Sequence, residues 1–189
     1  MKKWMTTTGL VMAMSLPMAV NAADYQIDTK GQHASVNFKV SHLGYSYTVG
    51  RFNDFSGTFS YDPADIEASK VNVEVDITSL DSNHAERDKH IRSDDFLDAS
   101  KFPKATFSST KVVDKGDGAF EITGDLTLMD KTVPMTIDAA LIGAGEDPWG
   151  GERAGFEGTA RINFSDFGIK ESAGASYADL DLYVEGVKQ

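Results

Sequence analysis

Residues 119–141 read AFEITGDLTLMDKTVPMTIDAAL, and apolar side chains recur at every second position on either side of a short polar break. Alternation with period two is typical of a strand that buries one face and exposes the other to water. The break at 129–132 predicts a hairpin turn between two antiparallel strands. The side chains expected on the buried face are Phe120, Ile122, Leu126, Leu128, Val133, Met135, Ile137, Ala139 and Leu141.

The same alternation recurs along most of the chain. Since a long series of half-buried strands must cover its apolar faces, the sequence predicts an all-β protein, an antiparallel barrel or sandwich of about eight strands. If the sheet closes on itself, the shared inner face is an apolar lumen. We expect irregular loops at 143–155 and 166–177. The other expected strands are 25–28, 33–41, 47–61, 71–79, 105–112, 156–164 and 180–184.

The expected strand at 47–61 contains two glycines. Val49, Phe55 and Phe59 are its prominent apolar residues, and they suggest one continuous alternating run. Gly50 and Gly57 are expected to mark bends or bulges, which a curved sheet requires.

A charged, helix-favouring segment at 82–100 interrupts the strands. Ser82 or Asn83 is expected to cap a helix, with Glu86 completing a capping-box pattern. Ser93 is expected to begin a second short turn that carries Phe96. We therefore expect a short helical excursion across one mouth of the barrel.

The N-terminal residues have the pattern of a secretory signal peptide. Lys2 and Lys3 precede an apolar run at 5–20, and small residues follow up to Ala22. Cleavage after Ala22 is expected, which leaves one domain of 167 residues at 23–189. The alternative is a membrane anchor, but the run is short and contains Pro17. The sequence thus predicts an exported protein, and no cysteine is present for lipid attachment or disulfides.

The charge of the chain argues against one class of function. The formal net charge is −11, and it becomes −13 when Lys2 and Lys3 are removed with the signal segment. We found no run of Lys or Arg that would form a local basic patch. Because nucleic acid is a polyanion, we expect this acidic chain not to bind it.

Four residues within 84–90 have helical spacing that could bring metal ligands together. His84 and Asp88 are four apart, as are Glu86 and His90. We favour a solvated helix face, in which basic neighbours such as Arg87 pair with the acids, and expect neither a metal site nor catalytic residues.

A hydrolase or isomerase site at 84–95 is the enzymatic alternative. The chain lacks nucleophile-elbow, phosphate-loop and dinucleotide motifs, so we expect a protein that is not an enzyme.

Six ordered motifs resemble the YceI-like proteins of the bacterial periplasm. The resemblance implies an extended, lipocalin-like antiparallel barrel with a short helical segment near one mouth. It also implies that the lumen holds a long isoprenoid lipid, either a polyprenyl phosphate or a quinone-type tail, and exchanges it through transient contact with membranes. The motifs are HASVNFKVSHLG at 33–44, GRFNDFSG at 50–57, RDKHIRSDDF at 87–96, FPKATF at 102–107, GDLTL at 124–128 and SDFGI at 165–169.

A set of inward-facing apolar residues is expected to line this lumen, with the lipid as the only bound group. An eight-stranded barrel is just wide enough to hold one small ligand or to fill with its own side chains. The alternative is therefore a filled barrel that acts through a protein partner or in a stress response; the oligomeric state is open. The expected lining is Phe38, Val40, Phe55, Phe59, Val73, Val75, Phe96, Phe107, Phe120, Leu126, Leu128, Ile137, Phe156 and Ile162.

Arg87 and Arg92 are the candidates for contact with a lipid head group, since the resemblance places their segment near the barrel mouth. A guanidinium fork matches phosphate oxygens, so either arginine would favour a phosphate over a quinone. The alternative is that Arg87 and Asp88 only tether the helix to the barrel.

Overall fold

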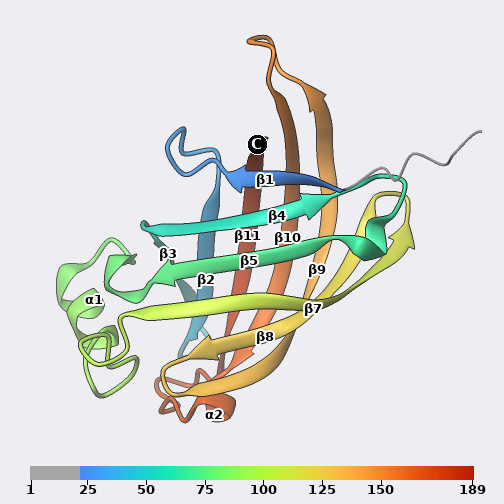
Figure 1. Cartoon of the computed structure of the whole chain (residues 1–189). Coiled ribbons are helices and arrows are strands. Elements are labelled where there is room, and N and C mark those ends of the chain that lie inside the picture. The colour runs from blue at the N-terminus through green and yellow to red at the C-terminus, as the bar shows by residue number, and fades with distance from the viewer. Residues whose placement is uncertain (1–21) are drawn as a thin grey trace, which may run out of the picture.

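The computed structural model describes residues 22–189, which form eleven strands and a few short helical turns (Figure 1). The proposed signal segment lies outside the described residues except for Ala22. The strands are β1 (Ala23–Ile27), β2 (Ser35–His42), β3 (Ser46–Phe52), β4 (Phe55–Tyr61), β5 (Lys70–Asp76), β6 (Leu80–Asp81), β7 (Lys104–Gly116), β8 (Ala119–Leu128), β9 (Lys131–Glu146), β10 (Glu152–Asn163) and β11 (Tyr177–Lys188).

The sheet closes into an eight-stranded antiparallel barrel. Strands β1, β4, β5, β7, β8, β9, β10 and β11 follow one another in hydrogen-bonded order, and β1 pairs with β11 to complete the ring. Tyr25 lies opposite Lys188 in this closing pair. Closure leaves no free edge in the ring, so the inward-facing side chains surround a common interior. The expected all-β barrel is confirmed.

The three remaining strands extend this ring at one end. β2 pairs with β11 next to β1, β3 pairs with β2, and β6 pairs with β3. Each of β2, β3 and β6 thus continues a wall strand of the ring after a break: β1 into β2, β4 into β3, and β5 into β6. A 3-10 turn at Ile77–Ser79 makes the last of these breaks. The broken strands explain how eight wall positions contain eleven strands.

The hairpin expected from residues 119–141 is confirmed in detail. β8 and β9 pair antiparallel from Ala119↔Ala140 to Leu128↔Lys131, with a two-residue turn at Met129 and Asp130. Met129 has φ of 58°, the left-handed conformation that tight hairpin turns require.

The prediction of one strand at 47–61 was wrong. β3 and β4 are separate strands with a bend at 53–54, and the bend reverses which parity of residue faces inward. Thr48 and Phe52 line the interior in β3, whereas Phe55 and Phe59 do so in β4. Val49, expected on the same face as Phe55, is therefore exposed.

The glycines expected to mark bends in this segment have another role. Gly50 pairs regularly with Phe38, and a β-carbon at Gly50 would lie 2.3 Å from the Phe38 ring. Gly57 pairs regularly with Val73. Gly50 therefore leaves the space that the Phe38 ring occupies.

The irregular loop expected at 143–155 is mostly strand. β9 and β10 extend to Glu146 and Glu152, and the hairpin that joins them projects at the top of Figure 1. Asp147 stabilises the turn, because its carboxylate accepts hydrogen bonds from the backbone N–H groups of Trp149 and Gly151. The prediction missed these strand ends because glycine and alanine obscure the alternation.

Two short α-helices lie at the end of the barrel where β2 and β3 meet. α1 (Ala85–Ile91) begins one or two residues later than expected, since His84 is the N-cap and its Nδ1 accepts the Arg87 backbone N–H at 3.2 Å. The prediction of Ser82 or Asn83 as the cap was wrong. α2 (Phe164–Phe167) follows β10, so Phe164 lies outside the strand expected to contain it. Among residues 22–189, no helix has the length and apolarity that a membrane span needs.

Candidate ligand-binding lumen

The barrel interior contains two apolar cavities that adjoin each other. The far cavity has a volume of about 170 Å³, and the helix-side cavity, which α1 helps to line, has a volume of about 330 Å³. The second value falls within the range of about 300–1,000 Å³ that is usual for small-molecule sites. Val36, Val75, Leu126 and Leu180 line both cavities, and we call them the waist. The interior is thus a partly filled tube narrowed at the waist.

Aromatic rings form much of the far cavity. Phe156 packs edge-on against three other rings, with centroid distances of 5.4 Å to Phe59, 5.2 Å to Tyr61 and 6.0 Å to Phe120. Edge-to-face pairs at these distances are favourable and fix the ring positions. Glu157 is the only exposed residue in the lining of this cavity, within the described part of the chain. The far cavity is therefore lined almost entirely by apolar side chains that are buried or half-buried.

The helix-side cavity reaches the surface. Its lining includes exposed residues of three segments: His42 on β2, His90 on α1 and Lys170 in the loop after α2. Arg87 also lines this cavity, and no Asp or Glu does so among residues 22–189. The titratable residues of the lining, His42, Arg87, His90 and Lys170, are therefore all basic. In a chain of net charge −11, the permanently charged groups in this lining are Arg87 and Lys170, and both are positive.

All fourteen apolar residues expected to line a lumen border one or both of these cavities. Whether they touch a ligand stays a prediction. The far cavity is bordered by Phe55, Phe59, Val73, Val75, Phe107, Phe120, Leu126, Ile137 and Phe156, and the helix-side cavity by Phe38, Val40, Val75, Phe96, Leu126, Leu128 and Ile162.

The two head-group candidates are in different places. Arg87 lines the helix-side cavity, whereas Arg92 lies outside its lining and donates from NH1 to the Leu80 carbonyl at 2.7 Å. Arg92 thus ties α1 to β6. Sequence reasoning did not select His42 or Lys170, although the HASVNFKVSHLG motif contains His42. The fold alone reveals their shared position, since 128 residues separate them along the chain.

Ser82 connects Arg87 and Asp88 just before α1. The Arg87 Nε donates to the Ser82 hydroxyl at 2.7 Å and NH2 donates to the Ser82 carbonyl at 2.5 Å. The buried Asp88 carboxylate accepts from the Ser82 backbone N–H at 3.0 Å and from its hydroxyl. Burial opposes ionisation of Asp88, but the hydrogen bonds from Ser82 outweigh it and lower its pKa. The expected tether between helix and barrel is therefore present, and it fixes one side of the Arg87 guanidinium.

The four residues weighed as metal ligands have separate partners. His84 caps α1, Asp88 accepts from Ser82, and His90 Nε2 lies 3.2 Å from the Asp95 carboxylate. Glu86 is an exposed residue in the first turn of α1. The helical spacing therefore does not produce a common site here.

A different group of three possible metal ligands lies where the loop between β1 and β2 meets β11. Asp28, His33 and Glu185 place one ligand atom each within 4.8 Å of one another. However, Arg153 NH1 lies 3.0 Å from the Asp28 carboxylate and 2.5 Å from that of Glu185. Because the Arg153 guanidinium forms ion pairs with both carboxylates, the cluster is an ion-pair network that joins β10 to β11 and to the loop after β1.

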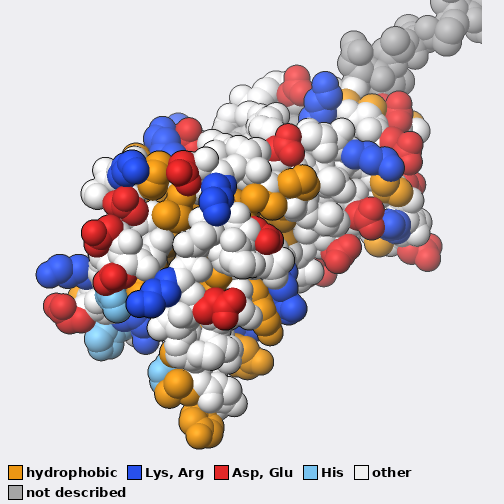
Figure 2. All heavy atoms as spheres, turned by 90° about the horizontal axis from the view of Figure 1, so that it is seen from below, with side chains coloured by type: hydrophobic (Ala, Val, Ile, Leu, Met, Phe, Trp, Pro, Cys, Tyr) orange, Lys and Arg blue, Asp and Glu red, His pale blue; other side chains and the backbone are white. Residues whose placement is uncertain are grey.

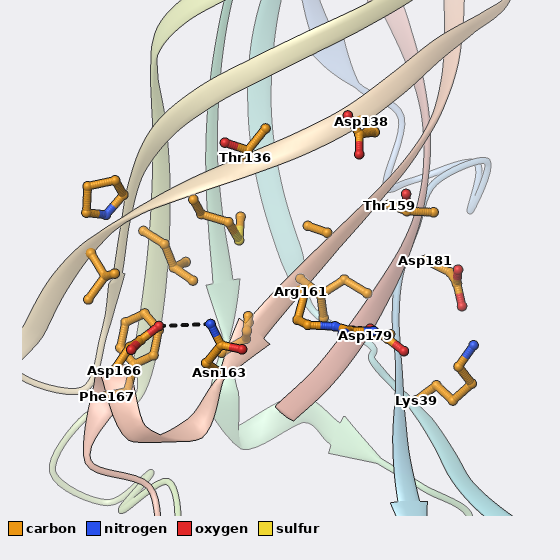
Figure 3. Close-up of a pocket in the computed structure, with 17 residues that line it drawn as sticks. Lys39, Thr136, Asp138, Thr159, Arg161, Asn163, Asp166, Phe167, Asp179 and Asp181 are labelled. Carbon is orange, nitrogen blue, oxygen red and sulfur yellow. Dashed lines mark hydrogen bonds and ion pairs between the residues drawn. The ribbon is translucent and has the colours of Figure 1, made fainter. Parts of the chain in front are cut away.

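A polar groove opens on the outside of the barrel where β9 and β10 separate (Figure 3). Within the described chain, their ladder ends at the Ile137↔Ala160 pair, and α2 follows below it. Arg161 pairs with Asp179 at 2.8 Å, and Asn163 at the end of β10 donates to Asp166 in α2 at 3.1 Å. The groove meets the lumen at apolar side chains that line both, which are Leu126, Met135, Ile162 and Leu180.

Comparison with known proteins agrees with this architecture. The YceI-like domain matches residues 25–185. A protein of Vibrio parahaemolyticus, named as a UPF0312 protein, is 64% identical over 189 residues and covers 100% of both chains. The crystal structure of the Campylobacter jejuni YceI protein has a TM-score of 0.73 and 29% identity, covering 79% of this chain and 90% of that one.

A more distant structure shares the fold. A domain from Saccharophagus degradans, described as polyisoprenoid-binding and implicated in plant cell wall breakdown, has a TM-score of 0.59 at 15% identity. It covers 89% of this chain and 100% of that one. The family match spans nearly all the described residues, and it includes the motifs from which the resemblance was inferred. The chain belongs to the YceI-like family.

Proposed function

We propose that this protein binds an isoprenoid lipid, with the tail in the barrel lumen and the head group at the helix-side opening. The observation that carries the proposal is a tube of two adjoining apolar cavities, of which the helix-side cavity has a basic opening. The polyisoprenoid-binding description of the Saccharophagus degradans domain supports the ligand class. An isoprenoid tail can pass from one cavity to the other at the waist, because the single bonds between its short units rotate and let the tail follow a bent path.

The bound lipid should exchange with membranes. Burying a methylene from water stabilises by about 0.8 kcal/mol, so a tail of several isoprene units would exceed the ceiling near 20 kcal/mol for non-covalent binding if water were its source. A membrane is the realistic source, and transfer from bilayer to barrel exchanges one apolar environment for another. We therefore propose a reversible carrier, which the signal-like segment at 1–22 would direct to the periplasm.

The charges at the opening favour an anionic head group. His42, Arg87, His90 and Lys170 all line the helix-side cavity. Arg87 uses Nε and NH2 to bind Ser82, and NH1 has no hydrogen-bond partner within residues 22–189. A phosphate would accept hydrogen bonds from Arg87 NH1 and from the ammonium group of Lys170, which lines the same cavity. A quinone offers only neutral carbonyls to these groups. We therefore propose a polyprenyl phosphate over a quinone.

Equilibrium binding of three lipids with matched tails tests this proposal. Delipidated protein would be titrated in detergent with a polyprenyl phosphate, the corresponding prenol and a quinone of similar tail length. We expect all three to bind and the phosphate to bind most tightly. Equal affinities would contradict the head-group assignment, and failure of all three to bind would contradict lipid binding itself.

A further inference from the structure

The hairpin that joins β2 and β3 carries an exposed apolar surface. Among residues 22–189, seven large hydrophobic side chains are strongly exposed, and four of them belong to this hairpin. Their exposed fractions are 55% for Leu43, 90% for Tyr45, 61% for Tyr47 and 61% for Val49. We call these four residues the hairpin patch. A patch of this kind on a soluble domain marks an interaction surface.

The hairpin patch lies beside the opening of the lumen. Ser41, His42 and Thr48, from the same two strands, line the helix-side cavity. The backbone N–H of Leu43 donates to the carbonyl of Ala173 at 2.8 Å, and Ala173 lines that cavity too. Figure 2 views the molecule from below and shows hydrophobic side chains gathered on a projecting part of this surface. A surface that binds the patch would therefore be adjacent to the opening.

The charge of this hairpin differs from that of the rest of the chain. Residues 29–53 form the longest run without Asp or Glu in the part of the sequence that the structure describes, and they contain Lys30, Lys39 and Arg51. The Lys39 ammonium lies 5.4 Å from the centre of the Tyr47 ring. On the neighbouring strand Asp179 is opposite Lys39, but it forms an ion pair with Arg161. The hairpin therefore presents aromatic and cationic groups with no acid of its own.

We propose that the hairpin patch inserts into the head-group region of an anionic lipid bilayer and holds the opening of the lumen against it. This inference rests on the proposed function, because a lipid carrier must bring its opening to a membrane. Tyrosine has an apolar ring and a polar hydroxyl, and so favours the interface between lipid and water. The cationic residues add attraction to anionic lipids, while the acidic remainder limits binding to transient contact.

Vesicle flotation tests the docking step by itself. The full chain would be mixed with vesicles of phosphatidylethanolamine and phosphatidylglycerol, without any isoprenoid. The test variant is Tyr45→Ser with Tyr47→Ser. The control is Trp149→Ser, which removes an aromatic side chain of 83% exposure from the β9–β10 hairpin. We expect the wild type and the control to float and the double variant to float about tenfold less.

The ionic contribution has its own measurement. Raising the salt concentration, or replacing phosphatidylglycerol with phosphatidylcholine, should reduce flotation of the wild type several-fold because salt and neutral lipid weaken the attraction of Lys39 and Arg51. Flotation of the double variant at wild-type levels would overturn the proposal. An equal loss of flotation in Trp149→Ser would also overturn it. So would a wild-type protein that does not float with vesicles and instead binds a protein through the hairpin patch.

A transfer assay separates this inference from the proposed function. Protein loaded with a polyprenyl phosphate in detergent would be mixed with acceptor vesicles, and the rate of lipid transfer followed. The double variant should retain its lipid in the native mass spectrum but transfer it about tenfold more slowly. If the wild type binds no isoprenoid, the proposed function fails while flotation still decides the docking. If the double variant transfers at the wild-type rate, the docking inference fails alone.

Discussion

At the scale of single residues, the helix-side opening combines apolar walls with titratable groups that are all basic among residues 22–189. Lys170 is the simplest residue through which to test this, because it is exposed and lines the cavity. Arg87 also lines it, but bonds from Arg87 to Ser82 give it a structural role as well.

We predict that Lys170→Gln lowers affinity for a polyprenyl phosphate about tenfold, equivalent to about 1.4 kcal/mol. Affinity for the uncharged prenol should not change, since its tail meets the same apolar walls. The matched control is Lys89→Gln, an exposed α1 residue outside the cavity lining. Titration with both lipids checks the result, and an equal loss for phosphate and prenol would rule out a head-group contact.

Sequence reasoning separated inward-facing from outward-facing side chains but could not choose between the arginines. Period two sorts inward from outward residues, and Phe107 and Phe120 line the far cavity as expected. Arg87 and Arg92 are five residues apart, which is a rotation of about 140° on a helix, so they cannot face the same way. Lys170 carries no local signal, because only the packing of the loop after α2 brings it to the opening.

Asp28 provides a residue-scale test of the ion-pair network. Hydrogen bonds from the Gly31 backbone, then from His33 and Arg153, hold the pKa of Asp28 at about 2, below its ordinary value of 3.8. Since the folded state favours the carboxylate, this group contributes stability above pH 4 and loses it as the pH falls towards 2.

We predict that Asp28→Asn lowers the free energy of unfolding by about 1–2 kcal/mol at pH 7. The difference from the wild type should shrink as the pH falls towards 2. Urea denaturation at several pH values measures this, with the exposed Asp94→Asn as the control. A deficit that is constant with pH would show that the Asp28 charge is not responsible.

At the scale of elements, the buried bonds around Ser82 hold α1 on the barrel. Ser82 and Asp88 are 4% and 6% exposed, so a polar group left without its partner there is costly. The sequence indicated a helix in this segment, but His84 in place of Ser82 caps it. Because Ser82 does not cap the helix, it can form hydrogen bonds with Asp88 and Arg87. Capping preferences do not predict these two contacts.

We predict that Ser82→Ala destabilises the protein by about 1–3 kcal/mol, because Asp88 loses a hydrogen-bond donor and Arg87 an acceptor. Ser100→Ala, at an exposed position, should change stability far less. Denaturation midpoints in urea provide the comparison. Equal stability of the two variants would show that the Ser82 network does not hold α1 in place.

Strand breaks were the part of the fold that local patterns described least well. The alternation in 47–61 looks continuous, yet the bend at 53–54 changes its phase and turns Val49 outward. The bend is required because β3 pairs with β2 while β4 pairs with β1. Such long-range pairing is invisible to a pattern that spans only a few residues.

At the scale of the whole molecule, the waist decides how much of the tube one ligand can use. Val75 is a waist residue, so a larger side chain there should separate the two cavities. We predict that Val75→Phe lowers affinity for long polyprenyl phosphates at least about tenfold and leaves short ones, which the helix-side cavity accommodates, nearly unchanged.

Val113→Phe is the control for this experiment, since Val113 follows the cavity-lining Val112 on β7 and faces the other side of the sheet. Thermal melting of both variants would show that the barrel remains folded. An equal loss of long and short lipids in Val75→Phe would contradict a ligand that passes through the waist.

Native mass spectrometry of the protein purified without added lipid, followed by organic extraction, tests the central claim most directly. We predict one isoprenoid per chain, with a phosphate on the extracted lipid. A bare protein mass that stays unchanged when polyprenyl phosphate, prenol or quinone is added would contradict the account, and would leave the cavities without a lipid role.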